Sequence, residues 1–239
     1  MSKINIHYFY NSGFSIETSN SILIFDYYRE SANTFEKTYT VEDLLSKEKP
    51  IYVFVSHNHS DHLNNKIFTW NSKNTNIKYI LSNDIKPKNM DNSYSFVKKN
   101  DTLTLDNLTI KVFGSTDAGV SFLVDLDGFN IFHAGDLNWW YWKEDSEEDN
   151  TYAEKWFKEE ISCLTGEKID LAFFPVDPRQ AEYYYLGGQY FIENINPKYF
   201  IPMHFGNDAE IINSFKNKVK DYPVTVLDIS KKDIELSIL

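Results

Sequence analysis

Short runs of β-branched and aromatic residues fill the first half of the chain, and this pattern predicts strands rather than helices. Residues 51–55 are all apolar or aromatic, which is typical of a buried strand. Turn-forming residues such as Asn11-Ser12-Gly13 and Asp127-Gly128 separate several of the runs. The strands predicted in this half are 4–10, 13–18, 21–25, 51–55, 77–81, 102–105, 108–113, 120–126 and 129–133.

The second half of the chain combines helical and strand-like patterns. Thr151 and Glu154 have the spacing of a capping box, and apolar residues at helical spacing follow them as far as Gly166. Asn207 and Glu210 predict the start of another helix. Outside these helices, the pattern predicts a solvated acidic loop at 143–150 and strands at 169–176, 198–202 and 223–229.

This order of elements places the chain in the α/β class, because strands come both before and between the helices. A sandwich of sheets covered by helices fits the order better than a regularly alternating βαβ barrel. No Pro- or Gly-rich linker, repeat or low-complexity tract divides the sequence. We therefore predict a single domain that spans residues 1–239.

Three histidines and one aspartate follow the predicted strand 51–55 directly, in the run His57-Asn58-His59-Ser60-Asp61-His62. Imidazole is the commonest metal ligand in proteins, and a carboxylate beside it suits a hard divalent cation. His57 and His59 are two residues apart, so they point to one side of an extended segment. Asp61 and His62 lie on the turn beyond them, and this spacing suits two adjacent metals better than one. The alternative is a polar loop that is rich in histidine without binding metal.

Two further candidate ligands also follow strand-like runs. Asp136 comes after residues 129–135, and His204 comes after residues 199–203. Loops that are held at strand ends by a rigid scaffold often carry functional residues. Asp136 and His204 therefore join the histidine-rich run in one candidate constellation.

With these elements, the sequence resembles the metallo-β-lactamase superfamily of metal-dependent hydrolases. The matching elements stand in the expected order and span most of the chain, and the six-residue motif is the specific one among them. The arrangement is most similar to the branch that includes ascorbate-6-phosphate lactonase-like proteins. The elements are His57-x-His59-x-Asp61-His62, Gly135-Asp136, Pro202-Met203-His204, and Asp26 at the end of the apolar run 22–25.

The resemblance implies a four-layer αββα sandwich with two metals at the strand ends. One or two divalent ions are thus the expected cofactors, with zinc as the first expectation and manganese or iron as alternatives. The implied ligands are His57 and His59 for the first metal, Asp61, His62 and His204 for the second, and Asp136 as a bridge between them.

One ligand that the superfamily normally supplies is missing here. A further histidine for the first metal is expected on a loop before the Gly-Asp element, but residues 113–119 contain none. Asp117 is the candidate replacement, and a turn-stabilising role is its alternative. An oxygen ligand in place of a nitrogen shifts the preference from zinc towards manganese or iron(II). A weak first site and a mononuclear enzyme form the other alternative.

The expected reaction is hydrolysis by metal-activated water, with Asp61 and His62 as the catalytic residues. Three residues are candidate substrate contacts: Arg29, Arg179 and Trp139. The two arginines are the only ones in the chain, and a guanidinium recognises carboxylate or phosphate. An ion pair with a neighbouring aspartate is the alternative for each arginine, and core packing is the alternative for Trp139. The expected substrate is a small ester, lactone or phosphoester, anionic or cyclic.

Composition narrows the partners and the compartment. The net charge of −11 argues against nucleic acid or an anionic membrane as a partner, because both require clustered Lys and Arg. The N-terminus has no signal-peptide pattern, and no apolar run approaches the ~20 residues of a membrane span. A single cysteine, Cys163, rules out an internal disulfide. We therefore expect a soluble, cytoplasmic protein.

Three other functions compete with the small-molecule hydrolase, and one of them is a diiron oxidoreductase of the same superfamily. The missing histidine favours a degenerate metal-binding module that no longer catalyses a reaction. A nuclease of the same superfamily is the third alternative, and the net negative charge argues against it.

Overall fold

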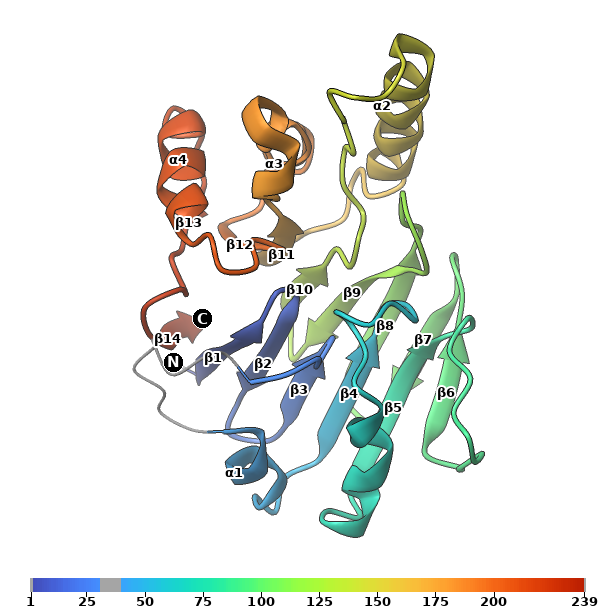
Figure 1. Cartoon of the computed structure of the whole chain (residues 1–239). Coiled ribbons are helices and arrows are strands. Elements are labelled where there is room, and N and C mark those ends of the chain that lie inside the picture. The colour runs from blue at the N-terminus through green and yellow to red at the C-terminus, as the bar shows by residue number, and fades with distance from the viewer. Residues whose placement is uncertain (1, 31–39, 239) are drawn as a thin grey trace. The chain divides into compact units, whose positions relative to one another are not determined.

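The computed structural model describes residues 2–30 and 40–238, which form two compact units. The first unit comprises Met1–Val97 and Ile229–Leu239, and the second comprises Lys98–Asp228. Each unit is built on one seven-stranded sheet (Figure 1). The prediction of a single domain concerns the two units together and stays a prediction.

The sheet of the first unit is mixed. Its neighbouring strands are antiparallel from β14 to β3 and parallel from β3 to β6. The last strand of the chain therefore pairs with the first (Figure 1). In order across the sheet, the strands are β14 (Ile234–Ile238), β1 (Ser2–Tyr10), β2 (Gly13–Glu17), β3 (Ile22–Phe25), β4 (Ile51–Val55), β5 (Ile77–Ser82) and β6 (Tyr94–Val97).

An apolar cluster joins this sheet to α1 (Val41–Leu45) and the 3-10 helix η1 (Asn65–Ser72). Leu44 of α1 and Trp70 of η1 belong to the same cluster as Val53 of β4, and all three side chains are fully buried. β3 and β4 are buried along their whole lengths, as the apolar run 51–55 predicted. The segments that follow β3 and β4 therefore start from fixed points in the unit.

The sheet of the second unit is also mixed. Its strands are antiparallel from β7 to β10 and parallel from β10 to β13. In order across the sheet, the strands are β13 (Thr225–Val226), β12 (Tyr199–Met203), β11 (Leu171–Pro175), β10 (Phe129–His133), β9 (Ser121–Leu126), β8 (Leu108–Phe113) and β7 (Thr102–Leu105). The helices of this unit are α2 (Glu147–Ser162), η2 (Pro178–Tyr183), α3 (Leu186–Ile195) and α4 (Glu210–Lys218).

Within residues 2–30 and 40–238, no helix has both the length and the hydropathy that crossing a membrane requires.

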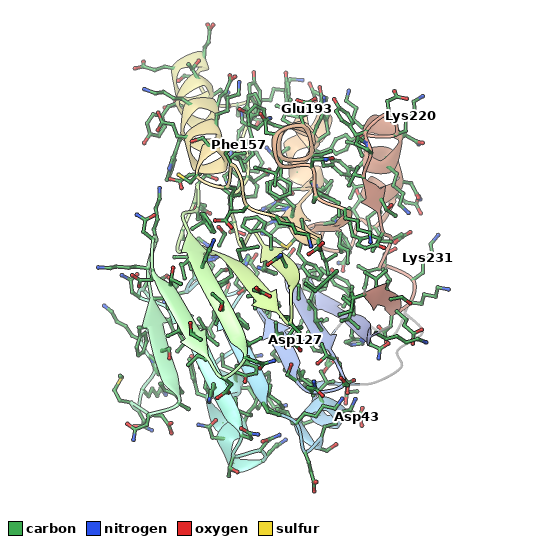
Figure 2. All side chains as sticks on the ribbon, turned by 180° about the vertical axis from the view of Figure 1, so that it is seen from behind. Asp43, Asp127, Phe157, Glu193, Lys220 and Lys231 are labelled. Carbon is green, nitrogen blue, oxygen red and sulfur yellow. The ribbon has the colours of Figure 1, made fainter. Side chains whose placement is uncertain are left out.

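Phenylalanine side chains join the three α-helices of this unit to its parallel strands. Phe191 of α3 stacks on Phe132 of β10 and Phe174 of β11, with ring centroids 5.5 and 4.6 Å apart. Phe157 of α2, which is labelled in Figure 2, also contacts this sheet. Its ring centroid lies 6.3 Å from that of Phe174. Phe215 of α4 stacks on a phenylalanine of β12 at 5.0 Å. One face of the sheet is thus covered by helices, and the strand ends are rigidly held.

Two helices begin at residues other than the predicted ones. The N-cap of α2 is Ser146, whose side chain accepts a hydrogen bond from the backbone N–H of Asp149, and not Thr151. The second half of the predicted acidic loop, 147–150, is therefore helical, because its carboxylates stabilise the positive end of the helix dipole. The N-cap of α4 is Ala209 rather than Asn207.

Candidate metal centre

The histidine-rich run of the first unit folds back on itself where β4 ends. The backbone N–H of His62 donates to the carbonyl of His59 at 3.1 Å, which closes a turn. The ring of His57 consequently lies 4.4 Å from that of His59 and 4.1 Å from that of His62, centroid to centroid. His57 and His62 are buried, whereas His59 is exposed and Asp61 is half-buried. The structure therefore gathers the four predicted ligands of this run in one place.

Asp26, the predicted strand-end aspartate, holds the buried histidines in position. It follows β3 with φ of 43° and accepts hydrogen bonds from the backbone and hydroxyl of Ser56, at 2.8 and 2.6 Å. It also lies 2.8 Å from Nδ1 of His62, while the Ser56 hydroxyl lies 2.9 Å from Nδ1 of His57. Since Nδ1 is engaged in both rings, Nε2 is the nitrogen placed to bind a metal. In His62 this nitrogen lies 3.7 Å from a carboxylate oxygen of Asp61.

Asn11 contacts Asp61 and was not predicted as a site residue. Its side-chain amide donates to Oδ2 of Asp61 at 3.0 Å. Its own backbone N–H donates to the hydroxyl of Tyr8 at 2.8 Å, and its φ is 55°. The sequence identified Asn11 only as a turn residue between two strands, because nothing local indicates that the turn reaches the run 57–62.

The second unit brings Asp136 and His204 together, although they are far apart in sequence. Oδ1 of Asp136 lies 3.5 Å from Nε2 of His204, and both side chains are buried. Nδ1 of His204 lies 2.9 Å from Oδ2 of Asp177. His204 therefore has the same arrangement as His62, with a buried carboxylate on Nδ1 and Nε2 directed at a second aspartate.

Asp177 also binds Arg179, so the ion pair expected as an alternative is present. Nε and Nη2 of Arg179 donate to Oδ2 of Asp177 at 2.9 and 2.5 Å. Burial opposes ionisation of Asp177, but the hydrogen bonds from His204 and Arg179 outweigh it and hold the pKa of this carboxyl below its usual range. Asp177 is therefore a buried anion that accepts hydrogen bonds from Arg179 and orients the ring of His204 through Nδ1.

A cavity of about 360 Å³ opens beside these residues in the second unit. Asp117, the tentative oxygen ligand, is exposed and lines the same cavity as Asp136 and His204. The volume lies within the range of about 300–1,000 Å³ that small-molecule sites occupy. The cavity is lined by Thr116, Asp117, Asp136, Trp140, Trp142, Asp145, Arg179 and His204.

The three predicted substrate contacts lie in different surroundings. Arg179 lines the cavity of the second unit. Arg29 lies in the first unit, with its guanidinium 3.8 Å above the ring of Tyr10. Trp139 does not line the cavity; its ring packs at 6.1 Å from Phe157 of α2 and also contacts α3. Of the tryptophans that follow Asp136, the cavity is lined instead by Trp140 and Trp142.

Residues 5–150 match a family model that is described as a β-lactamase superfamily domain. The chain belongs to this superfamily. The matched region covers more than half of the sequence and includes the run 57–62 as well as Asp136. No curated protein sequence matches the chain.

Several solved structures have the same fold. Igni18, described as a metallo hydrolase from the archaeon Ignicoccus hospitalis, is 17% identical with a TM-score of 0.67 over 99% of this chain and 100% of that chain. A putative metal-dependent hydrolase from Parabacteroides distasonis is 17% identical, with a TM-score of 0.60 and coverage of 95% and 92%. CmlA, described as a diiron β-hydroxylase from Streptomyces venezuelae, is 10% identical, with a TM-score of 0.64 over 98% of this chain and 54% of that chain.

These similarities confirm the predicted fold class and family. The chain has a metallo-β-lactamase-like α/β fold with two mixed sheets and flanking helices, and it belongs to the β-lactamase superfamily. The histidine and aspartate groups of both units fit a divalent ion, because imidazole nitrogens and carboxylate oxygens are its ordinary ligands. The ligand assignments, the ion and the branch within the superfamily stay predictions.

Proposed function

We propose that this protein hydrolyses a small ester, lactone or phosphoester with water activated by one or two divalent metal ions. The proposal rests chiefly on one shared feature of His57, His62 and His204. In each buried ring, Nδ1 is bonded to a hydroxyl or carboxylate, at 2.9, 2.8 and 2.9 Å. Such partners orient metal-binding histidines and raise their basicity. The buried His7 has a partner of the same kind, Asp233 at 2.6 Å, so the proposal also rests on the clustering of His57 with His59 and His62 and of His204 with Asp136.

The proposed ligands have distinct tasks. A bound ion would lower the pKa of a water molecule towards about 7, which would supply hydroxide at neutral pH. Asp61 is held by Asn11 and orients the attacking water, while Asp26 and Asp177 keep the rings of His62 and His204 in place. The ligand set that we propose is His57, His59, Asp61, His62, Asp136 and His204, with Asp117 as the oxygen ligand in place of the missing histidine.

The identity of the ion depends on Asp117. Zinc suits the imidazole-rich set, whereas an additional carboxylate favours manganese or iron. The diiron description of CmlA keeps an iron centre among the alternatives for this chain. A cytoplasmic location and a small, anionic substrate are further parts of the proposal.

The first experiment is the metal content of tag-free protein purified without chelators, measured by elemental mass spectrometry. Two ions per chain would support a binuclear hydrolase with Asp117 or solvent completing the first site. One ion would support a mononuclear enzyme that uses Asp61, His62 and His204. No bound ion, even after reloading, would overturn the proposal.

A non-catalytic metal-binding module is the second candidate, and the absence of histidine from residues 113–119 favours it. A screen of metal-loaded protein against esters, lactones and phosphodiesters separates the two. Turnover that depends on Asp61 and His62 supports the hydrolase, whereas tight metal binding without turnover of any of these bonds supports the module.

A further inference from the structure

Two tryptophans form a flat apolar wall in the cavity of the second unit. The indoles of Trp140 and Trp142 are parallel within 5°, with ring centroids 5.8 Å apart, and both are half-buried. Nε1 of Trp140 donates to the backbone carbonyl of Asp136 at 3.0 Å. The backbone of Trp142 exchanges hydrogen bonds of 3.0 and 2.8 Å with the side chain of Asn150. The wall is therefore held in place before any ligand arrives.

Arg179 adds a fixed cation beside this wall. Its guanidinium lies 5.9 Å from the ring centre of Trp142. Asp177, whose side chain is only 1% exposed, binds the guanidinium edge, yet 63% of the arginine side chain is exposed. A guanidinium that is both held and accessible is suited to receive a carboxylate from a ligand.

The charges around the cavity limit how much negative charge a ligand can carry. Asp117, Asp136 and Asp145 line the cavity, and Arg179 is the only Lys or Arg among its lining residues. Asp136 belongs to the proposed metal centre, whereas Asp145 lies on the same wall as the tryptophans. One anionic group of a ligand can face Arg179. A second anionic group would lie near the carboxylates of the three aspartates, which would repel it.

Buried amide groups join the loops that carry these residues. Gln180 donates to the backbone carbonyl of Trp139 at 2.8 Å and accepts from Asn138 at 2.8 Å. The hydroxyl of Thr116 donates to the carbonyl of Asn138 at 2.6 Å. The three loops that contribute to the cavity are thereby locked together, which reduces the ordering cost of ligand binding.

We propose that this cavity selects substrates that carry a planar ring and a single carboxylate. The ring packs against Trp140 and Trp142, and the carboxylate binds Arg179. The group to be hydrolysed then faces Asp136 and His204, and in this respect the inference rests on the hydrolase function proposed above. The inference thus narrows the substrate from small esters in general to esters or lactones that carry an aromatic ring and, separately from the bond to be hydrolysed, one free carboxylate.

Binding of three unreactive probes tests the inference without turnover. Benzoate and cyclohexanecarboxylate have similar size and charge but differ in planarity, whereas benzamide has the shape of benzoate without its charge. We expect calorimetry of metal-loaded and metal-free protein to show benzoate binding about three- to tenfold more tightly than cyclohexanecarboxylate. Benzoate should also bind about three- to fivefold more tightly than benzamide, a modest factor because Arg179 is 63% exposed.

Variants assign these preferences to the two side-chain types. Trp142→Leu should abolish the preference for benzoate over cyclohexanecarboxylate. Trp156→Leu is the matched control, since Trp156 is a half-buried tryptophan whose ring lies at an angle of 48° to that of Tyr152 and does not line the cavity. Arg179→Gln should abolish the preference for benzoate over benzamide and leave benzamide binding unchanged. A carboxylate that only binds the metal would keep its affinity in Arg179→Gln.

Equal affinity of the wild-type protein for benzoate and cyclohexanecarboxylate would overturn the ring site, and equal affinity for benzoate and benzamide would overturn the carboxylate site. Both results are available from the wild-type protein even if a variant fails to fold. A protein that shows the expected preferences but binds no metal would instead contradict the hydrolase proposal and leave this binding site intact.

Discussion

The two units carry their candidate metal ligands in different ways. In the first unit, four candidate ligands come from one run of six residues. The fully buried side chain of Asp26 holds this run in place through Ser56 and His62. In the second unit, Asp136 and His204 come from loops that are far apart in sequence, and they border an open cavity. The first unit is therefore specialised for holding ligands, whereas the second combines ligands with a surface that a substrate can reach.

In each unit a buried carboxylate is hydrogen-bonded to a histidine ring, but the surroundings of the two carboxylates differ. Asp26 bonds to Ser56 and His62, and all three side chains are sealed from solvent. Asp177 bonds to His204 but also to Arg179, which is 63% exposed. A ligand that binds the exposed Arg179 can consequently alter the position of His204 through Asp177. Asp26, in contrast, connects His62 to the buried Ser56.

The largest effects should come from removing a ligand in each unit. We expect His62→Ala and His204→Ala each to lower turnover by about a thousandfold, because a metal supplies several kcal/mol of transition-state stabilisation. Elemental analysis should show reduced metal content in both variants. His7→Asn is the control, since His7 is also buried, with Nδ1 2.6 Å from Asp233, but is not among the candidate metal ligands. Full turnover in either alanine variant would exclude that histidine from the centre.

The two carboxylates that hold histidines provide the next comparison. Asp26→Asn and Asp177→Asn should each weaken metal affinity by about 10- to 100-fold, which metal titration measures. Both variants should lower the unfolding temperature, because both carboxylates are buried and accept several hydrogen bonds. The loss should be larger for Asp26→Asn, since Ser56 and His62 are buried whereas the Arg179 partner of Asp177 is 63% exposed and can bind water instead. Equal losses of thermal stability in both variants would contradict the contrast between a sealed and an accessible arrangement.

A smaller effect is expected where α3 passes the loop after Asp136. A Cβ at Gly187 would lie 1.9 Å from Oδ1 of Asn138 and 2.9 Å from the backbone nitrogen of Trp139. Gly187→Ala should therefore cost about 1–3 kcal/mol of unfolding free energy in urea denaturation. Combining it with Asn138→Ala removes the closest clash, so the double variant should lose less than the sum of the single variants. Additive losses would show that the clash is relieved in some other way.

The smallest effect is expected in the first unit, at the ion pairs of Glu17. Burial opposes ionisation of Glu17, but the hydrogen bonds and charges of Lys47 and Lys49 outweigh it and lower the pKa of the carboxyl. A pKa that folding lowers contributes stability above the unfolded-state value, and this stability is lost as the pH falls through the folded-state value. Glu17→Gln should thus cost about 1 kcal/mol at pH 7 and progressively less in acid.

Urea denaturation at neutral and acidic pH measures this change. Glu42→Gln is the control, because Glu42 pairs with Lys66 and Lys73 on the exposed face of α1. Ion pairs on an exposed surface contribute little to stability. A Glu17→Gln loss that stays constant across this pH range would show that packing, and not charge, stabilises the site.

Strands with a strong apolar pattern could be predicted from the sequence to the residue. The predicted bounds 51–55, 102–105, 108–113 and 129–133 are those of the structure. β6 and β14 were missed because they are edge strands with exposed side chains and a weak pattern. α3 was missed because no side chain caps its start. The start of α2 was misplaced because Ser146 and Thr151 both begin a capping-box pattern, and the sequence alone does not rank them.

The candidate site was predictable only where its residues are local or follow a strand. The run 57–62 is contiguous, and Asp136 and His204 end strand patterns. Asn11 and Asp177 were not predicted as partners of Asp61 and His204, because tertiary packing creates those contacts. For the same reason, the sequence does not distinguish Trp139, which packs between helices, from the tryptophans that line the cavity.

Asp26 and His204 have positive φ angles, 43° and 63°, in the left-handed region that glycine adopts without penalty. Holding a non-glycine residue there costs about 1–2 kcal/mol, so each position trades stability for a side chain that the proposed reaction needs. Selection for thermal stability alone would therefore favour glycine at His204, and it would yield a more robust but inactive protein. Substitutions intended to raise the thermal stability of this protein should therefore be sought at positions other than Asp26 and His204.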